Sequence, residues 1–355
     1  MTKKITTDAV IIGAGPVGLF AAFSCGMLNI RTVVVDALDF IGGQCTALYP
    51  EKPIYDIAGY PSVSAEDLIK NLQAQAAPFS PEYLLGQQVV EVHKFTVDSS
   101  QGGSHVNSEP VNRELFTIKT SAGTEIKTKL IIIAAGCGAF GPNRPPINGL
   151  EEFEKTGAVQ YFVKAKEEFR GKKVVIAGGG DSAVDWANIL ADVTDKLYVA
   201  HRRDKFRAAP ESVSRMMKLA EAGKIEFVIP YQPSGLIGNN GKLEKIEIKD
   251  LQGNSKQLEA DNLLCFFGLA MELGPIANWG LSLDKNHIAV EPSNCQTNVP
   301  GIYAIGDICN YNGKLKLIAC GFSEAAMAAH HAYNRVFDKP LHFEYSTSKG
   351  VPHAA

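Results

Sequence analysis

A chain of 355 residues is long for a single hydrophobic core, so we expect two domains. Apolar residues make up 45% of the chain, which is typical of a globular protein. The net charge is −3 and the sequence has no basic block, which argues against a nucleic-acid-binding protein. The seven cysteines are dispersed without C-x-x-C spacing, which excludes a disulfide framework or a cysteine zinc site and indicates reduced thiols. No apolar stretch reaches the roughly 18 residues of a membrane span, so we expect a cytoplasmic protein.

The first nucleotide-binding pattern lies at the N-terminus. Residues 8–13 predict a buried strand, 16–28 a helix and 30–36 a second strand, which together make a βαβ unit. The turn between the first strand and the helix has the spacing G-x-G-x-x-G and a proline at the helix start: Gly13, Gly15, Pro16 and Gly18. Such a turn places backbone N–H groups and a helix N-terminus against a diphosphate. A signal peptide is the alternative, because Lys3 and Lys4 precede the apolar run, but the glycines interrupt that run.

The acid at the end of the second strand, Asp36, indicates which dinucleotide binds. Its carboxylate would accept hydrogen bonds from ribose hydroxyls and repel a 2′-phosphate, which favours NAD or FAD over NADP. Residues 297–307 then resemble the T-x6-A-x-G-D pattern of flavoproteins with two dinucleotide sites, in which the aspartate bonds the ribityl chain of FAD. Asp307 therefore favours FAD, and a helix N-cap is its alternative role. Gly43 and Gln44, just after the second strand, fit the same interpretation.

A second βαβ unit begins near residue 172, with strands at 172–178 and 196–203 and a helix at 182–192. Its glycine-rich turn contributes the expected phosphate contacts Gly178, Gly180, Asp181, Ser182 and Ala183. Where an acid would mark NAD, the chain instead carries a basic group: His201, Arg202, Arg203 and Arg207. Guanidinium groups match a phosphate in geometry and charge, so the expected ligand is NADPH, and a solvated basic turn is the alternative.

Two stretches rich in Gly and Pro enclose the second unit. Residues 140–150 are expected to be a linker without helix or strand, and a second break is expected at 268–275. The second unit is therefore inserted into the first. We expect an α/β fold of two Rossmann-like domains: an FAD-binding domain of residues 1–141 and 270–355, which includes a C-terminal tail, and an NADPH-binding domain of residues 142–269.

The order of these motifs resembles thioredoxin reductase over nearly the whole chain. Thioredoxin reductases carry a C-x-x-C pair shortly before the second glycine loop, where this chain has Phe162 and Ala165. Cys45, a second candidate thiol, has no partner cysteine nearby in the sequence, and a dithiol relay needs two sulfurs. The chain is more similar to the thioredoxin-reductase-like ferredoxin–NADP⁺ reductases, in the segments "GGQCTALYPEKPIYDIAGYP", "GGGDSAVDWA", "HRRDKFRA", "NWGL" and "YSTS".

This resemblance implies a homodimer in which each C-terminal tail reaches the partner's flavin. It places Tyr49 on one face of the flavin ring, Tyr345 on the other and Thr347 at the ring edge. It also places the backbone of Val89 at the adenine and Phe140 beside the first crossing between domains. Rings on both faces would block the nicotinamide, so either one ring moves or the NADPH domain rotates about residues 141–149 and 268–275.

The implied reaction is hydride transfer between NADPH and FAD, with single electrons then passing between FAD and a ferredoxin or flavodoxin. The flavin carries the chemistry, so no catalytic side chain and no metal is expected. A disulfide reductase or diaphorase with another acceptor is one alternative, and a non-catalytic sensor that binds FAD and NADPH is another. A flavin monooxygenase is disfavoured, because "EEFRGKK" lacks the histidine of the F-x-G-x-x-x-H pattern.

Overall fold

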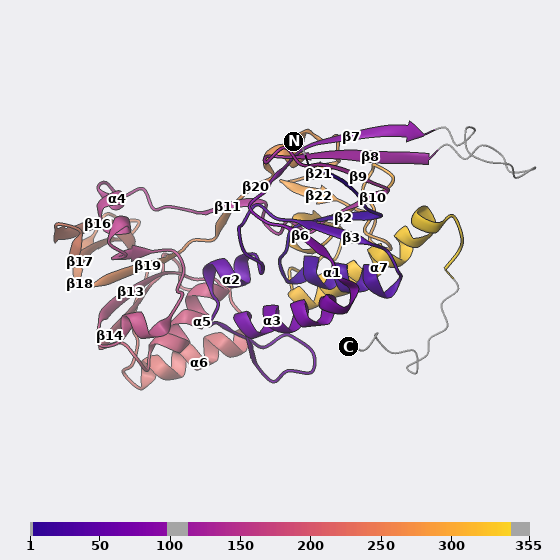
Figure 1. Ribbon diagram of the computed structural model, residues 1–355. Helices are drawn as coiled ribbons and strands as arrows, with labels where there is room; N and C mark the ends of the chain where they lie inside the picture. The colour runs from indigo at the N-terminus through magenta and orange to yellow at the C-terminus, as the bar shows by residue number, and fades with distance from the viewer. Residues whose placement is uncertain (1–2, 98–112, 342–355) are drawn as a thin grey trace, which may run out of the picture. The chain divides into compact units, whose positions relative to one another are not determined.

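The computed structural model describes residues 3–97 and 113–341. The chain forms two compact units: unit 1 comprises Met1–Ala139 with Met271–Ala355, and unit 2 comprises Phe140–Ala270. Figure 1 shows both units, coloured from indigo at the N-terminus to yellow at the C-terminus. Among the described residues, no helix combines the length and apolar content that crossing a bilayer requires.

Unit 1 is built around a parallel five-stranded sheet in the order β23-β10-β2-β3-β6. Every residue of the two central strands β2 and β10 is buried, as in parallel sheets that are covered on both faces. The strands are β2 (Ala9–Ile12), β3 (Thr32–Val35), β6 (Glu82–Leu84), β10 (Leu130–Ile133) and β23 (Ile302–Ala304). The strand, turn and helix expected at the N-terminus are therefore confirmed, and the apolar run considered as a signal peptide forms β2 and α1.

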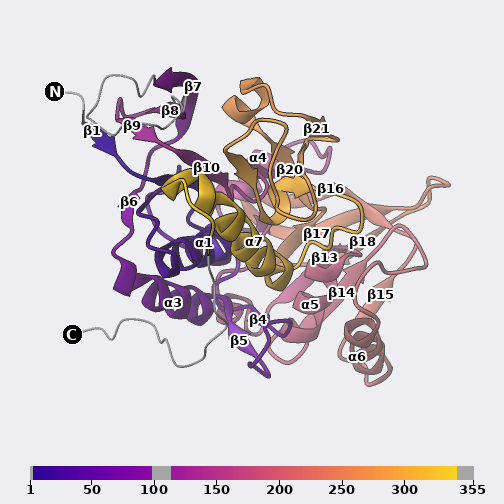
Figure 2. The same ribbon diagram turned by 90° about the vertical axis from the view of Figure 1, so that its right-hand side faces the viewer.

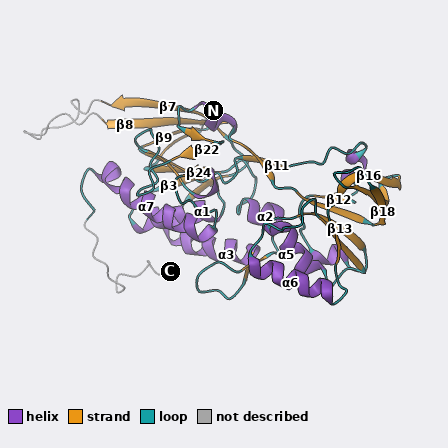
Figure 3. Ribbon diagram, turned by 180° about the vertical axis from the view of Figure 1, so that it is seen from behind, coloured by secondary structure: helices purple, strands orange, loops and turns teal. Residues whose placement is uncertain are grey.

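Helices cover one face of this sheet, and Figures 1 and 3 show α1 (Pro16–Met27), α3 (Ala65–Ala76) and α7 (Ile318–Phe337) there. Small buried residues on α1 and α7 let these helices pack closely: Ala21, Ala22, Ala325, Ala328 and Ala329. The shorter elements nearby are α2 (Gln44–Leu48), β4 (Pro53–Ile54), β5 (Val63–Ser64) and a 3-10 turn at Ala77–Phe79. Because the strands of this sheet are parallel, the loops that follow their carboxyl ends meet at one edge of the sheet.

The opposite face is covered by a four-stranded sheet in the order β1-β9-β8-β7. Phe116 and Ile118 of this sheet pack on Val10 and Ile131 of the parallel sheet. The strands are β1 (Lys4–Thr6), β7 (Val89–Val97), β8 (Arg113–Thr120) and β9 (Glu125–Thr128). A small third sheet comprises β21 (Leu283–Asp284), β22 (His287–Ala289) and β24 (Cys309–Asn310), preceded by a 3-10 turn at Gly274–Asn278.

Unit 2 has its own parallel five-stranded sheet, in the order β12-β19-β13-β14-β15, of which Figure 2 labels β13, β14 and β15. Its strands are β12 (Val159–Gln160), β13 (Lys173–Gly178), β14 (Lys196–Ala200), β15 (Glu226–Val228) and β19 (Asn262–Phe266). Its helices are α4 (Leu150–Lys155), α5 (Asp181–Leu190) and α6 (Pro210–Glu221), with a 3-10 turn at Lys166–Phe169. An antiparallel sheet packs on one face: β16 (Gln232–Asn239), β17 (Lys242–Lys249) and β18 (Ser255–Glu259).

The two crossings between the units contain strands, which corrects the expectation of a plain linker at 140–150. β11 (Ala139–Pro142) and β20 (Leu269–Glu272) pair as a two-stranded sheet. The backbone N–H of Asn143 extends the contact by donating to the carbonyl of Gly268 at 3.1 Å. Two extended segments that run together satisfy each other's backbone groups, which a pattern read along one segment cannot show. The expected boundary after residue 141 falls inside β11.

Candidate functional site

The first glycine loop joins β2 to α1, and two of its glycines have no room for a side chain. Gly13 has φ +111°, and a Cβ there would lie 2.3 Å from the carbonyl oxygen of Ala134. A Cβ on Gly18 would lie 1.9 Å from the carbonyl oxygen of Gly13. The N-terminus of α1 is therefore held tightly against the ends of β2 and β10.

Gly15 differs from these two because its backbone faces open space. A Cβ added there would meet only the Cα of Gly43, at 4.0 Å. Gly15 is the N-cap of α1 and Pro16 is its first residue, so no side chain covers the start of this helix from within the loop. A helix N-terminus with an uncovered glycine N-cap is suited to a diphosphate group.

Asp36 lies just after β3, and both of its carboxylate oxygens accept backbone hydrogen bonds. The N–H of Ala14 donates to Oδ2 at 2.6 Å, and the N–H of Leu38 donates to Oδ1 at 2.8 Å. Burial raises the pKa of Asp36, and these two N–H donors oppose the rise. Each oxygen keeps a second lone pair that can accept a ribose hydroxyl.

A second group of polar residues gathers at the same edge of the sheet, from three distant segments. The side-chain nitrogen of Gln44 lies 3.3 Å from the place of a Cβ on Gly136, beside Cys137 and just after β10. Asp307, in a 3-10 turn after β23, acts electrostatically on both Cys137 and Tyr49. The fold therefore brings Gln44, Tyr49 and Asp307, three of the expected FAD contacts, into one cluster.

Asp307 does not cap a helix, so the alternative role considered for it is wrong. The next α-helix, α7, begins at Ile318 with Leu317 as its N-cap. Residues 309–310 form strand β24 instead, because they pair with β22. The side chain of Asp307 is half-buried.

Cys45 is buried beneath Tyr49, which forms the end of α2. Its Sγ donates a weak hydrogen bond to the Tyr49 hydroxyl at 3.9 Å, and burial raises the pKa of the thiol to about 11. Such a thiol is almost entirely protonated at neutral pH and is a poor nucleophile. All seven cysteines of the chain are unpaired, and Phe162 and Ala165 carry no sulfur.

The remaining expected FAD contacts are less closely grouped. Val89 begins β7 and is buried, and the pairing with β8 shifts register between Val89 and Glu91. Phe140 lies in β11. Tyr345 and Thr347 lie outside the described residues.

The second glycine loop joins β13 to α5 and repeats the design of the first. Gly178 has φ +155°, and a Cβ there would lie 2.6 Å from the carbonyl oxygen of Phe266. The N-cap of α5 is Gly180, and Asp181 and Ser182 are exposed in the first turn. Ala183, at the third position of the motif, is buried with its Cβ near Gly178.

The basic segment after β14, residues 201–207, is joined to this loop by hydrogen bonds of its backbone N–H groups and those of the residues that follow it. The N–H of Arg207 donates to the carbonyl of Gly179 at 2.7 Å, and the N–H of Ala209 donates to Oδ1 of Asp181 at 2.9 Å. The three arginines of the segment are exposed: Arg202, Arg203 and Arg207. The loop and the guanidinium groups therefore belong to one surface of unit 2.

His201, the first residue of that segment, points inward. Its ring is stacked on Phe206 and fills the space beside Gly179, where a Cβ would lie 2.2 Å from the imidazole. Nε2 lies 3.2 Å from the carbonyl of Lys205. Burial lowers the pKa of His201, and the neighbouring arginines lower it further. His201 therefore shapes the loop as a neutral side chain, and sequence reasoning did not foresee this orientation.

The chain has two glycine loops, one with Asp36 beside it after β3 and one with arginines beside it after β14. These features define an oxidoreductase with two dinucleotide sites. A family model described as pyridine nucleotide-disulphide oxidoreductase matches residues 7–334, and the chain belongs to this family. Within the described residues, no group of His, Cys, Asp and Glu could hold a metal ion.

Curated relatives extend over nearly the whole chain. A ferredoxin–NADP reductase from Granulibacter bethesdensis is 56% identical over 351 residues, which cover 99% of this chain and 95% of the relative. A ferredoxin–NADP reductase from Acidiphilium cryptum is 55% identical over 356 residues and covers 100% of both chains.

Solved structures share the fold at lower identity. Thioredoxin reductase from Lactococcus lactis is 25% identical with a TM-score of 0.77, covering 94% of this chain and 100% of that one. Thioredoxin reductase from T. acidophilum is 23% identical with a TM-score of 0.76, covering 93% and 98% respectively, and shows the fold alone. The expected fold of two Rossmann-like domains is confirmed.

Proposed function

We propose that this chain transfers electrons between NADPH and a ferredoxin or flavodoxin through FAD, with FAD bound to unit 1 and NADPH to unit 2. The chain is an oxidoreductase of the ferredoxin–NADP reductase type with FAD and NADPH as cofactors, because curated relatives at 55–57% identity over nearly full length carry that name. The observation that carries the proposal is the pair of complete glycine loops, with Asp36 beside one and arginines beside the other.

The residues of unit 1 fit FAD. The open backbone at Gly15 and the start of α1 would hold the diphosphate, and Asp36 would accept hydrogen bonds from the ribose hydroxyls. Asp307 would bind the ribityl chain, and Gln44 and Tyr49, in the same cluster, would contact the flavin ring. When bound, FAD accepts a hydride from nicotinamide and can pass electrons on singly.

The residues of unit 2 fit NADPH. The loop from Gly178 to Ala183 would bind the diphosphate at the start of α5, with Asp181 and Ser182 in the first turn. Arg202, Arg203 and Arg207 would bind the 2′-phosphate, and His201 would keep the loop in shape. The exposed arginines give unit 2 a preference for NADPH over NADH.

The other expected features belong to the same proposal. They are a homodimer, a cytoplasmic location, contacts of Val89, Phe140, Tyr345 and Thr347 with FAD, and movement of an aromatic ring or of the NADPH-binding unit before hydride transfer. The resemblance to thioredoxin-reductase-like ferredoxin–NADP⁺ reductases supports them.

The test is NADPH-dependent reduction of cytochrome c by the FAD-loaded protein, with and without ferredoxin. We expect a rate that depends strongly on ferredoxin, because the flavin would have no thiol relay to another acceptor. A healthy rate with artificial acceptors but no dependence on ferredoxin would contradict the proposed partner. No turnover with any acceptor would contradict enzymatic function and favour a sensor.

A further inference from the structure

Helix α7 carries a carboxylate, Glu324, to which the proposed reaction assigns no role. Its side chain is 1% exposed. Among the described residues, only Glu324 and Asp8 are buried carboxylates. Burying a carboxylate costs free energy unless it is paired and hydrogen-bonded, so the partners of Glu324 indicate what it does.

The partners of Glu324 come from one short segment, residues 306–314, directly after β23. The backbone N–H of Gly306 donates to Oε2 at 2.7 Å, and the hydroxyl of Tyr311 donates to Oε1 at 2.7 Å. The ammonium of Lys314 forms a salt bridge with Oε1, and its side chain is 3% exposed. The thiol of Cys309 donates a weak hydrogen bond to Oε2 at 3.7 Å, so one carboxylate contacts four residues of this segment.

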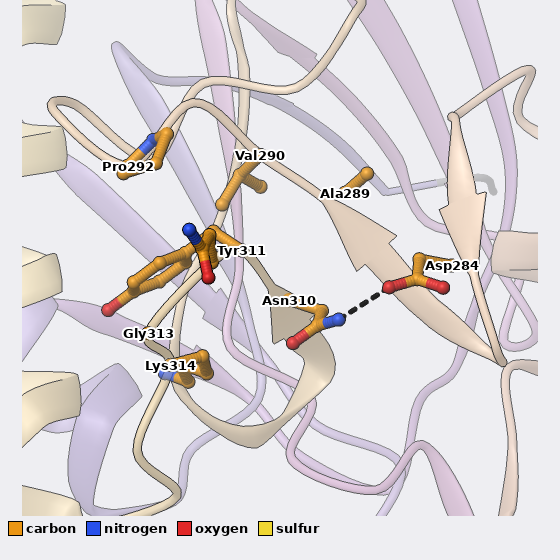
Figure 4. A pocket seen from close by; sticks show the side chains of 9 residues that line it. Asp284, Ala289, Val290, Pro292, Asn310, Tyr311, Gly313 and Lys314 are labelled. Carbon is orange, nitrogen blue, oxygen red and sulfur yellow. Dashed lines mark hydrogen bonds between the residues drawn. The ribbon is translucent and has the colours of Figure 1, made fainter.

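The same segment is also fastened on its outer side. Tyr311 and Lys314 line a surface hollow of about 600 Å³ together with Asn310 and Asp284 (Figure 4). Nδ2 of Asn310 donates to Oδ2 of Asp284 at 2.6 Å. The polar groups of these four side chains thus bond within the protein, and the segment is held from both sides.

The bond to Gly306 is the one that bears on the cofactor site. Gly306 has φ +74°, and it immediately precedes Asp307 in the 3-10 turn. A Cβ on Gly306 would lie 3.5 Å from Val17, in the first turn of α1, so the turn lies beside the first glycine loop. A buried N–H needs an acceptor, and Glu324 supplies it.

Stability alone does not explain the buried ion pair. Replacing a buried ion pair by apolar residues of similar size is often neutral or stabilising. A methionine pair at 324 and 314 would fill the space but could not accept the hydrogen bond from Gly306. Glu324 therefore differs from an apolar residue in that its carboxylate oxygen accepts this hydrogen bond.

We propose that Glu324 is a positioning residue for the flavin, which holds the turn at Gly306 so that Asp307 meets the ribityl chain of FAD. Lys314 neutralises the charge that this acceptor brings into the interior. The proposal rests on the proposed function, because it takes Asp307 as a contact of FAD.

Two double variants separate the acceptor from the ion pair. Glu324→Gln with Lys314→Met removes both charges but keeps an oxygen for the Gly306 N–H. Glu324→Met with Lys314→Met removes the charges and the oxygen. We measure the FAD dissociation constant by fluorescence titration of the apo-protein, the visible circular dichroism of bound FAD, and the melting temperature of the apo-protein.

We expect the glutamine variant to bind FAD nearly as wild type does. The methionine variant should bind FAD about 10- to 100-fold more weakly, the effect of losing one buried hydrogen bond, with an altered circular dichroism spectrum. The methionine apo-protein should also melt at a lower temperature than the glutamine apo-protein, because the buried N–H of Gly306 loses its acceptor. The Asp8→Asn control separates this loss of stability from the loss of FAD affinity. Equal FAD affinities in the two double variants would overturn the proposal.

Asp8→Asn is the matched control, because Asp8 is the other buried carboxylate and precedes β2, at the opposite edge of the same sheet. It accepts hydrogen bonds from Arg31 and pairs with Lys129. This variant should lower the melting temperature without changing the FAD dissociation constant, and a matching loss of FAD affinity would overturn a specific role for Glu324. A wild-type protein that binds no FAD would instead overturn the proposed function, and this inference with it.

Discussion

Three exposed arginines after β14 decide, in our proposal, which nicotinamide nucleotide unit 2 accepts. We expect Arg203→Ala together with Arg207→Ala to raise the KM for NADPH at least about 100-fold, because two guanidinium–phosphate bonds of roughly 1.5–3 kcal/mol each are lost. The KM for NADH should change little, because NADH has no 2′-phosphate.

Steady-state kinetics with both nucleotides check this prediction. Arg215→Ala is the control, because Arg215 is an exposed arginine of α6 outside the basic segment. An equal rise in KM for NADPH and NADH would show that the arginines do not read the 2′-phosphate.

His201 makes unit 2 sensitive to pH. Burial holds the pKa of His201 below its ordinary value of 6.5, so the folded protein binds this proton less readily than the unfolded chain. The free energy of unfolding therefore has its full value above pH 6.5, and it decreases as the pH falls through the lowered pKa of His201. We therefore expect the melting temperature to drop on acidification from pH 7.5 to about 5.5, and His201→Asn to reduce that drop.

Thermal melts of both proteins at several pH values measure this effect. His93→Asn is the matched control, because His93 is an exposed histidine that pairs with Glu91 on the surface of unit 1. An equal drop in melting temperature for wild type and His201→Asn would contradict the view that His201 causes this pH sensitivity.

The first glycine loop holds α1 against β2 through a contact that leaves no space. We expect Gly18→Ala to prevent stable FAD binding, because the new methyl group would lie 1.9 Å from the carbonyl oxygen of Gly13 and would push the helix away. The FAD content of the purified protein, read from its absorption spectrum, is the measurement. Gly141→Ala should be neutral, since nothing lies within 4 Å of a Cβ there, and wild-type FAD content in Gly18→Ala would contradict the packing argument.

The elements that sequence could predict are those with a local pattern. The two βαβ units and their loops were predicted because strand, glycine turn and helix follow one another within about thirty residues. The acid Asp36 and the arginines were placed by the same local spacing. Their binding roles stay predictions.

Features that depend on distant segments were out of reach. The strand β11 exists because β20 lies beside it, and the ring of His201 turns inward because Gly179 leaves space for it. Glu324 is one polar residue among the small residues of α7, and the role that we propose for it emerges only from the hydrogen bond to Gly306. Each of these needs the tertiary fold, and no local pattern along the chain encodes it.

The whole molecule combines one continuous unit with one split unit. We expect a fragment of residues 140–270 to fold alone and to bind NADP⁺, because it contains a complete sheet and its own core. Residues 1–139 alone should not fold, because β10 would lose its partner β23 and α1 would lose α7. Cooperative melting of each fragment is the measurement, and a folded 1–139 fragment would contradict this view of unit 1.

The position of β23 also sets the order of events on the ribosome. Synthesis at about 5–20 residues per second leaves roughly ten to thirty seconds between the emergence of β10 and that of β23. During this interval the inserted unit can complete its fold, while the half-made sheet outside it keeps an unpaired edge that invites aggregation or chaperone binding. The turn at Gly306 and helix α7 emerge later still, so the flavin site that we propose is complete only after α7 has left the ribosome.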